Sequence, residues 1–184
     1  PIEIIKTRIK TPGSLFQKIE KRGLEVSERT LLEEIHDIAG VRVICSFIDD
    51  IYEVARLLVG QDDVTLLETK DYIRHPKPNG YRSLHLILQI PVFFADRKQK
   101  MTVEVQIRTL AMDFWASLDH ELHYKHEEGP ELQDVEEELR QCAEVIAQTD
   151  VRMQNIRKRI YGETPWKKKQ EEEDGVCDSK SDGE

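Results

Sequence analysis

Apolar and polar residues follow two different periods along the chain, and these periods predict an alternation of strands and helices. Residues 41–48 are rich in β-branched side chains and predict a buried strand. The next segment, 49–59, places apolar residues on one helical face. This mixture predicts an α/β or α+β domain with a mixed β-sheet flanked by helices. The remaining expected elements are strands at 64–68, 81–90 and 102–108, and helices at 28–37, at 110–124 and from Leu15 onward behind a Ser14 cap.

The strand expected at 102–108 alternates strictly between apolar and polar residues. Three β-branched residues point to one face of the sheet, whereas Glu104, Gln106 and Arg108 point to the other. We therefore expect one face of the sheet to be buried under helices. The polar face is either a plain solvated surface or the location of a functional site.

The C-terminal region carries a longer helical pattern. Apolar residues recur every seven positions in two sets offset by three, over residues 132–160. This predicts a long amphipathic helix within 128–162 that either folds back on its own domain or forms a subunit interface. The chain is thus divided into a domain at 1–127, this helix, and a polar tail at 163–184 that is expected to be disordered.

Composition narrows the class of protein. The 184 residues are 39% hydrophobic and 34% charged, which suits one domain with an appended helix. No apolar run is long enough to cross a membrane, and no leader peptide is visible. The three cysteines lie far apart and form neither a zinc-type spacing nor a disulfide framework, so we expect a cytoplasmic protein.

Charge is distributed unevenly along the chain. The formal net charge of −9 argues against a generic binder of duplex DNA. The first 22 residues nevertheless hold six Lys or Arg against two acidic residues. Such a segment is either a solvated basic face or a binding site for an anion, and the phosphates of a small molecule fit it better than a polymer does.

Residues that can carry chemistry gather in a few segments. Hard divalent metals prefer carboxylate oxygens, and Mg²⁺ uses one or two of them together with phosphate oxygens and water. Asp37 and Glu104 therefore predict a Mg²⁺ site whose surrounding cations neutralise a polyphosphate, a layout that suits phosphoryl-type transfer. The segments are RIK at 8–10, HDIAGVR at 36–42, NGYRSLH at 79–85 and EVQIRT at 104–109.

Simpler interpretations compete with this one. Asp37 taken alone is more often a cap of a helix or turn. The pair His36-Asp37 also occurs in metal-dependent phosphohydrolases, but further suitably placed His and Asp residues are missing. The histidines at 120, 123 and 126 suggest zinc, yet their spacing is one residue short of the metalloprotease pattern.

Taken together, the motifs RIK, DIAGVR, PNGYRSLH and EVQIRTLAMDFWASLDHELHYK resemble the synthetase domain of RelA/SpoT homologues. The resemblance runs in order from about residue 1 to 160, and the chain is similar to the stand-alone small alarmone synthetases. The stretches KPNGYRSLH and MDFWASLDH resemble the RelP-type branch more than the RelQ-type branch. The resemblance implies a nucleotidyltransferase-like fold. It also implies transfer of the β,γ-pyrophosphate of ATP to the 3′-OH of GDP or GTP, which yields AMP and the stringent-response alarmone ppGpp or pppGpp.

The same resemblance implies roles for individual residues. Asp37 matches a Mg²⁺ ligand, and Glu104 matches the residue that helps to hold Mg²⁺ and activates the 3′-OH. Tyr81 matches the tyrosine that stacks on guanine. Residues that match the ATP side are Arg8, Lys10, Ser14, Lys18, Lys21 and, near the adenine, Arg42. Further residues that match the GDP or GTP side are Lys77, His85, Gln106 and Asp113.

Two other functions stay open as alternatives. One is a Mg²⁺-dependent nucleotidyltransferase on the same fold, which would release pyrophosphate instead of AMP. The other is a non-catalytic oligomer that binds nucleotide or single-stranded RNA through the basic N-terminal segment, although a pure binder has no need of the Asp37 and Glu104 carboxylates. The family often assembles as homotetramers, so a homo-oligomer is expected, and no membrane partner is expected.

Overall fold

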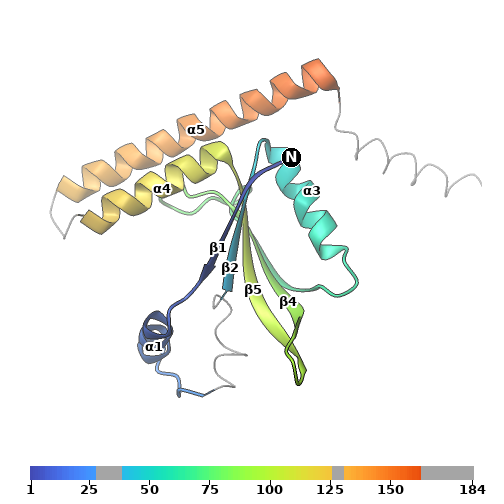
Figure 1. Ribbon diagram of the computed structural model, residues 1–184. Helices are drawn as coiled ribbons and strands as arrows, with labels where there is room; N and C mark the ends of the chain where they lie inside the picture. Colours follow the sequence, from blue (N-terminus) through green and yellow to red (C-terminus); the bar gives the residue numbers. More distant parts are fainter. Residues whose placement is uncertain (28–38, 126–130, 163–184) are drawn as a thin grey trace, which may run out of the picture.

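The computed structural model describes residues 1–27, 39–125 and 131–162. Within these ranges a five-stranded sheet carries helices on one face and across one end (Figure 1). The helix expected at 28–37, which includes Asp37, and the tail expected at 163–184 lie outside the described residues. The domain boundary expected at 127–128 also lies outside them, so the division of the chain into three parts stays a prediction.

The sheet is mixed, as the sequence predicts. Its strand order is β1-β2-β5-β4-β3. Strands β2 and β5 run parallel, whereas every other neighbouring pair is antiparallel. This topology confirms the α+β class with a mixed sheet. The strands are β1 (Ile2–Ile9), β2 (Ala39–Cys45), β3 (Thr65–Asp71), β4 (Leu84–Phe93) and β5 (Lys98–Thr109).

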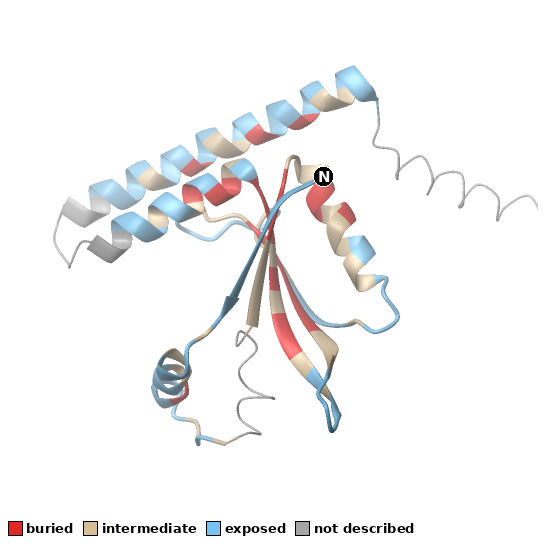
Figure 2. Ribbon diagram, in the orientation of Figure 1, coloured by how far each residue is buried: buried red, intermediate tan, exposed pale blue. Residues whose placement is uncertain are grey.

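One face of the sheet carries the hydrophobic core, and helix α3 (Ile48–Val59) covers it (Figure 2). Alternate residues of β5, namely Val103, Val105 and Ile107, are buried in this core. Burying one face leaves the intervening polar residues of β5 on the opposite face, which confirms the two-faced strand that the alternation predicts. The site residues of this strand therefore stand on a rigid, packed support.

Helices α4 (Leu110–Lys125) and α5 (Glu131–Tyr161) lie side by side across one end of the sheet (Figure 1). The indole Nε1 of Trp115 donates a hydrogen bond to the carbonyl oxygen of Leu139, at 2.9 Å. Asp150 and Gln154 on α5 are also buried against the domain. The C-terminal helix therefore packs on its own domain, and its role in a subunit interface stays a prediction. No described helix combines the length and the apolar character that a bilayer span requires.

The N-terminal segment differs from the prediction. Strand β1 pairs with β2, although the sequence pattern did not predict a strand there. Every residue of β1 is exposed and its register shifts between Ile2 and Ile4, so no buried apolar face marks it. Helix α1 (Pro12–Lys21) also begins earlier than expected, because the Thr11 side chain is its cap and accepts a hydrogen bond from the Ser14 N–H at 3.4 Å. Pro at the first helical position suits this start, since its missing N–H would have no helical partner there.

Candidate active site

Strand pairing aligns the polar residues of four strands on the open face of the sheet. In one row, Lys6 is opposite Arg42, Arg42 is opposite Gln106, and Gln106 is opposite His85. In the next row, Arg8 is opposite Gly40, and Gly40 is opposite Glu104. Paired residues on neighbouring strands point to the same face, so these side chains form one continuous polar surface. Gly40 has no side chain, which leaves open space between Arg8 and Glu104.

A cavity of about 370 Å³ lies over these rows. Its wall combines four basic side chains with the single carboxylate of Glu104. Such a cavity suits a polyanion, because the basic groups neutralise phosphate charge and the carboxylate is a ligand type that hard divalent metals prefer. The lining residues are Lys6, Thr7, Arg8, Lys10, Gly40, Val41, Arg42, Glu104 and Gln106.

A second cavity, of about 760 Å³, adjoins the first, and the two share three lining residues. Its other walls come from Tyr81 and from helix α4. Cavities of a few hundred cubic ångströms are the usual size for small-molecule sites, so each of the two has the size of such a site. The lining residues are Arg8, Arg42, Tyr81, Gln106, Arg108, Ala116, Ser117, Asp119 and His120.

Glu104 is linked to Tyr81 through His85. The Nδ1 atom of His85 lies 3.0 Å from Oε1 of Glu104. The other ring nitrogen, Nε2, lies 2.8 Å from the Tyr81 hydroxyl oxygen. His85 is buried, so its ring holds a defined orientation between the two side chains. The predicted base and the predicted stacking residue are therefore parts of one hydrogen-bonded chain.

Arg108 is a central residue of the site that the sequence interpretation did not assign a role. Its side chain is only 4% exposed, and this burial lowers the pKa of the guanidinium. It donates hydrogen bonds at 2.8 Å to the Tyr81 hydroxyl and to Oε1 of Gln106, and at 3.2 Å to Asp113. The guanidinium fork thereby fixes three predicted acceptor-side residues relative to one another.

Asp113 is surrounded by basic groups. Besides Arg108, it accepts a hydrogen bond from Lys6 at 3.2 Å and from Arg42 at 3.5 Å. The carboxylate therefore ties β1, β2 and β5 together at the start of α4. Its predicted contact with guanine stays a prediction.

The ring of Tyr81 lies among cationic and aromatic groups. The Nζ atom of Lys77 lies 4.9 Å from the centroid of the Tyr81 ring and 4.9 Å from that of Tyr72. The Arg108 guanidinium lies 5.2 Å from the Tyr81 centroid. Tyr72 and His85 each meet the Tyr81 ring edge-on. The predicted pair of Lys77 and Tyr81 is thus brought together.

The donor set fits a hard divalent cation. Glu104 supplies a carboxylate at the cavity, and Mg²⁺ needs only one or two of these when phosphate oxygens and water complete its shell. Asp37, the second predicted ligand, lies outside the described residues. Among the residues that the structure describes, no cluster of three or more His, Cys, Asp or Glu offers the all-protein site that zinc would use.

The structure brings most predicted residues together but leaves some apart. Arg8, Lys10, Arg42, Glu104 and Gln106 line the first cavity. Three predicted ATP-side residues belong to helix α1 and are not among the described residues that line either cavity; these are Ser14, Lys18 and Lys21. Lys6 and Arg108 are two basic lining residues among those that the interpretation missed. Lys6 has a sequence signal, because Lys6, Arg8 and Lys10 alternate as they would on one face of a strand.

Comparison with known proteins gives consistent matches. The family described as the region found in RelA/SpoT proteins matches residues 7–129. GTP pyrophosphokinase YwaC of Bacillus subtilis is 46% identical over 160 residues, which covers 87% of this chain and 76% of that protein. The crystal structure of small alarmone synthetase 2 from Bacillus subtilis aligns with a TM-score of 0.77 at 45% identity, over 86% of this chain and 82% of that one.

A second solved structure carries a ligand. Small alarmone synthetase 1 from Bacillus subtilis, bound to its product pppGpp, aligns with a TM-score of 0.76 at 35% identity, over 86% of this chain and 80% of that one. These likenesses do not separate the RelP-type branch from the RelQ-type branch, so that assignment stays a prediction.

Proposed function

The chain belongs to the RelA/SpoT family, and we propose that it is a GTP pyrophosphokinase that makes the alarmones ppGpp and pppGpp. It transfers the β,γ-pyrophosphate of ATP to the 3′-OH of GDP or GTP and releases AMP. One observation carries the proposal. Glu104 lies in a cavity lined by basic residues, and that cavity adjoins a second one that contains Tyr81.

The basic cavity is the donor side of the proposed site. Arg8, Lys10 and Arg42 neutralise the triphosphate of ATP, and their charges also stabilise the additional charge that develops during transfer. Helix α1 follows Lys10 almost directly, so its Ser14, Lys18 and Lys21 are placed on the same side of the molecule as the phosphates in this proposal. The free N–H groups at a helix start favour phosphate as well.

The second cavity is the acceptor side. Tyr81 stacks on the guanine base, and Lys77, His85, Gln106 and Asp113 surround the acceptor nucleotide. The cationic groups of Lys77 and Arg108 lie over the Tyr81 ring. A stacked base takes the place of one of them, and Lys77, on an exposed loop, moves more easily than the buried Arg108.

Glu104 acts on the acceptor hydroxyl. Its carboxylate accepts the proton of the 3′-OH while the 3′-oxygen forms a bond to the β-phosphorus of ATP. The bond from that phosphorus to the oxygen bridging the α- and β-phosphates breaks, and AMP leaves with this oxygen. Glu104 and Asp37 would hold Mg²⁺, which when bound supplies charge neutralisation at the transferred phosphates. His85 keeps the Glu104 carboxylate oriented.

Product analysis tests the proposal directly. Incubation with ATP, GDP and Mg²⁺ should yield ppGpp and AMP, resolved by anion-exchange chromatography. Glu104→Gln, which keeps the shape but removes the base, should lower turnover by at least about 100-fold while the fold persists. Release of pyrophosphate instead of AMP would favour the alternative nucleotidyltransferase. Wild-type amounts of product from Glu104→Gln would show that Glu104 is not the base.

We further propose that the enzyme is a cytoplasmic homo-oligomer, a tetramer by family resemblance. Helix α5 presents an apolar stripe to solvent, made of residues spaced three and four apart; we call it the outer stripe, and it consists of Cys142, Val145, Thr149, Met153, Ile156 and Ile160. Such spacing suits packing against a second helix. Both cysteines in the described ranges are free thiols, as a reducing compartment would keep them.

A further inference from the structure

The loop between β3 and β4, residues 72–83, carries Lys77 and Tyr81; we call it the acceptor loop. Hydrogen bonds within it form a compact turn. Lys77 N–H donates to the Tyr81 carbonyl at 3.2 Å, and Gly80 N–H donates to the Lys77 carbonyl at 2.8 Å. Asn79 accepts from the Tyr81 N–H at 3.2 Å. These bonds set the shape of the turn, but they do not fix its position on the domain.

Gly80 fixes that position by direct contact with helix α5. It is buried and has a φ of +91°, which side chains rarely tolerate. A Cβ atom on Gly80 would lie 2.5 Å from the Cβ of Ala143 and 3.6 Å from the Arg140 carbonyl oxygen. Ala143 is itself buried. The backbone of the acceptor loop therefore rests on α5 at a point where neither partner has room for a larger side chain.

Arg82 adds a polar clamp beside this contact. Its Nη1 donates to the Gly80 carbonyl at 3.2 Å and to the Ala143 carbonyl at 3.4 Å. Its Nη2 lies 3.3 Å from the Glu144 carboxylate. The side chain is 14% exposed and lines neither of the two cavities of the candidate active site. Arg82 therefore bonds the loop to α5 and does not face the nucleotides.

Helix α5 is itself held firmly along its length. Thr109, the last residue of β5, donates a hydrogen bond to Asp150. Farther along, Arg157 pairs with the fully buried Asp50 of α3 at 2.7 Å. The loop is thus supported by a helix that is bonded to the catalytic strand and to the core helix. A loop held in one conformation loses less entropy when it binds a ligand.

We propose that Arg82 is a positioning residue for the acceptor nucleotide, which acts by clamping the acceptor loop to helix α5. The inference rests on the proposed function and extends it. Because Tyr81 directly precedes Arg82, release of the clamp lets the stacking ring leave its productive place. The residues proposed to bind ATP lie on β1, α1, the segment between them and β2, so ATP binding should not depend on the clamp.

Steady-state kinetics with Arg82→Gln tests the inference. The variant should raise KM for GDP about tenfold, the loss expected for charge-assisted hydrogen bonds. The value of kcat and the KM for ATP should change less than about twofold. Arg82→Lys keeps the charge beside Glu144 but cannot bridge both carbonyls, so it should restore part of the lost affinity.

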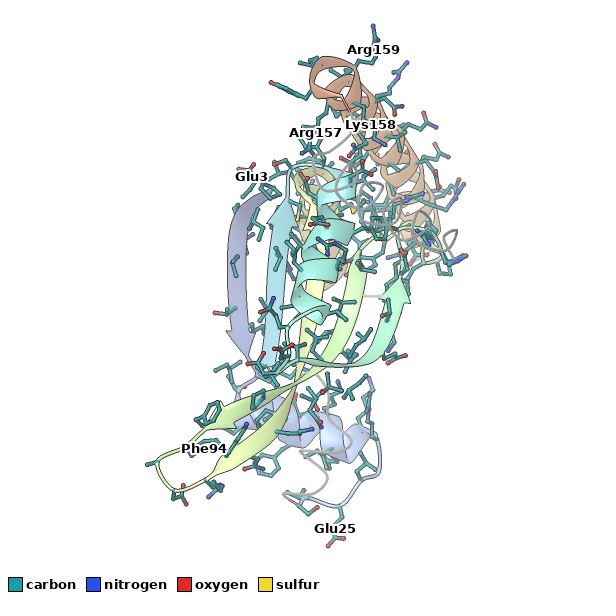
Figure 3. The ribbon with its side chains drawn as sticks, turned by 90° about the vertical axis from the view of Figure 1, so that its right-hand side faces the viewer. Glu3, Glu25, Phe94, Arg157, Lys158 and Arg159 are labelled. Atoms are coloured by element: carbon teal, nitrogen blue, oxygen red, sulfur yellow. The ribbon has the colours of Figure 1, made fainter. Side chains whose placement is uncertain are left out.

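A substitution on α5 should disturb the acceptor loop as the change of Arg82 does. Ala143→Val adds bulk only on the helix, against Gly80, and should also raise KM for GDP without raising KM for ATP. Arg159→Gln is the matched control, since Arg159 is exposed and points away from the rest of the molecule at the far end of α5 (Figure 3). It should leave both KM values unchanged.

The outcomes separate the two proposals. An unchanged KM for GDP in Arg82→Gln, or an equal rise in both KM values, overturns the clamp while an active wild-type enzyme still supports the synthetase function. A wild-type protein that makes no alarmone overturns the synthetase function itself. Thermal melting shows whether Ala143→Val folds. If it does not fold, the KM values of Arg82→Gln and Arg82→Lys alone test the clamp.

Discussion

Tyr81 makes two kinds of contact, one through its ring and one through its hydroxyl group. The ring meets Lys77 and Tyr72 as well as Arg108 and His85, whereas the hydroxyl oxygen lies 2.8 Å from both Arg108 and His85 and is hydrogen-bonded to them. Stacking on a base needs only the ring. The hydroxyl instead holds the ring in place and links it to Glu104. The two functions can therefore be separated by substitution.

Tyr81→Ala should weaken the use of GDP and GTP. Base–aromatic stacking contributes about 1–3 kcal/mol, so the acceptor KM should rise about tenfold or more, while the ATP KM stays near its original value. Tyr81→Phe keeps the ring and loses only the hydroxyl contacts, so its acceptor KM should rise less. Initial rates at varied GDP concentration measure both. Unchanged acceptor kinetics in Tyr81→Ala would contradict the stacking role.

The roles of single residues were predictable only where a local pattern exposes them. Strict alternation in β5 places Glu104 and Gln106 on the polar face. Arg108 follows the same alternation, yet its importance comes from contacts with Tyr81 and Asp113, which only the folded chain brings near. Lys6 was missed with the strand that carries it. Tertiary contacts of this kind leave no periodic signal in the sequence.

At the scale of elements, the apolar pattern located the core elements and missed those stabilised by polar contacts. Helix α3 and strands β2, β4 and β5 bury apolar faces, and all four were predicted near their observed bounds. Strand β1 buries nothing and was missed. Helix α5 was predicted, but its heptad residues largely face solvent, and the side that packs on the domain includes the polar residues Asp150, Gln154 and Arg157.

The contacts of Thr109, at the end of β5, with α4 and α5 predict that the stability of the protein depends on pH; we call this contact region the joint. Thr109 caps α4 by accepting the Met112 N–H, and its own hydroxyl donates to the Asp150 carboxylate. Burial raises the pKa of Asp150 above its usual 3.8, and the hydrogen bond from Thr109 only partly opposes this. The folded protein therefore binds this proton more tightly than the unfolded chain does. The joint should lose stability as the pH rises through the folded-state pKa of Asp150.

Asp150→Asn should remove this dependence. The amide oxygen still accepts from Thr109 but does not ionise, so the free energy of unfolding of the variant should increase relative to wild type as the pH rises above about 4. Urea unfolding at several pH values measures the difference. Asp134→Asn, at an exposed position of the same helix, is the control. A wild-type protein that gains stability over Asp150→Asn with rising pH would contradict the assignment.

At the scale of the whole molecule, two neighbouring sides of helix α5 have different surroundings. One side holds the domain and the acceptor loop. The adjacent side is the outer stripe, on which Met153, Ile156 and Ile160 are 53%, 47% and 65% exposed. Contiguous exposed apolar surface of this kind on a folded domain marks an interaction site. The outer stripe of a second copy of the chain can cover this surface, because a two-fold contact uses the same residues on both subunits.

The pair of substitutions Met153→Glu and Ile156→Glu should therefore disperse the oligomer, because it places unpaired carboxylates in an apolar contact. Sedimentation velocity should then report the 21.5 kDa single chain, whereas the unsubstituted protein should sediment as an assembly. Asn155→Glu adds the same charge on a side of α5 away from both the domain and the outer stripe, so its assembly should be intact. Glu104 and Tyr81 line adjoining cavities within the same chain, and the dispersed protein should accordingly still form ppGpp. A double variant that sediments like the unsubstituted protein would show that the outer stripe is not the contact between subunits.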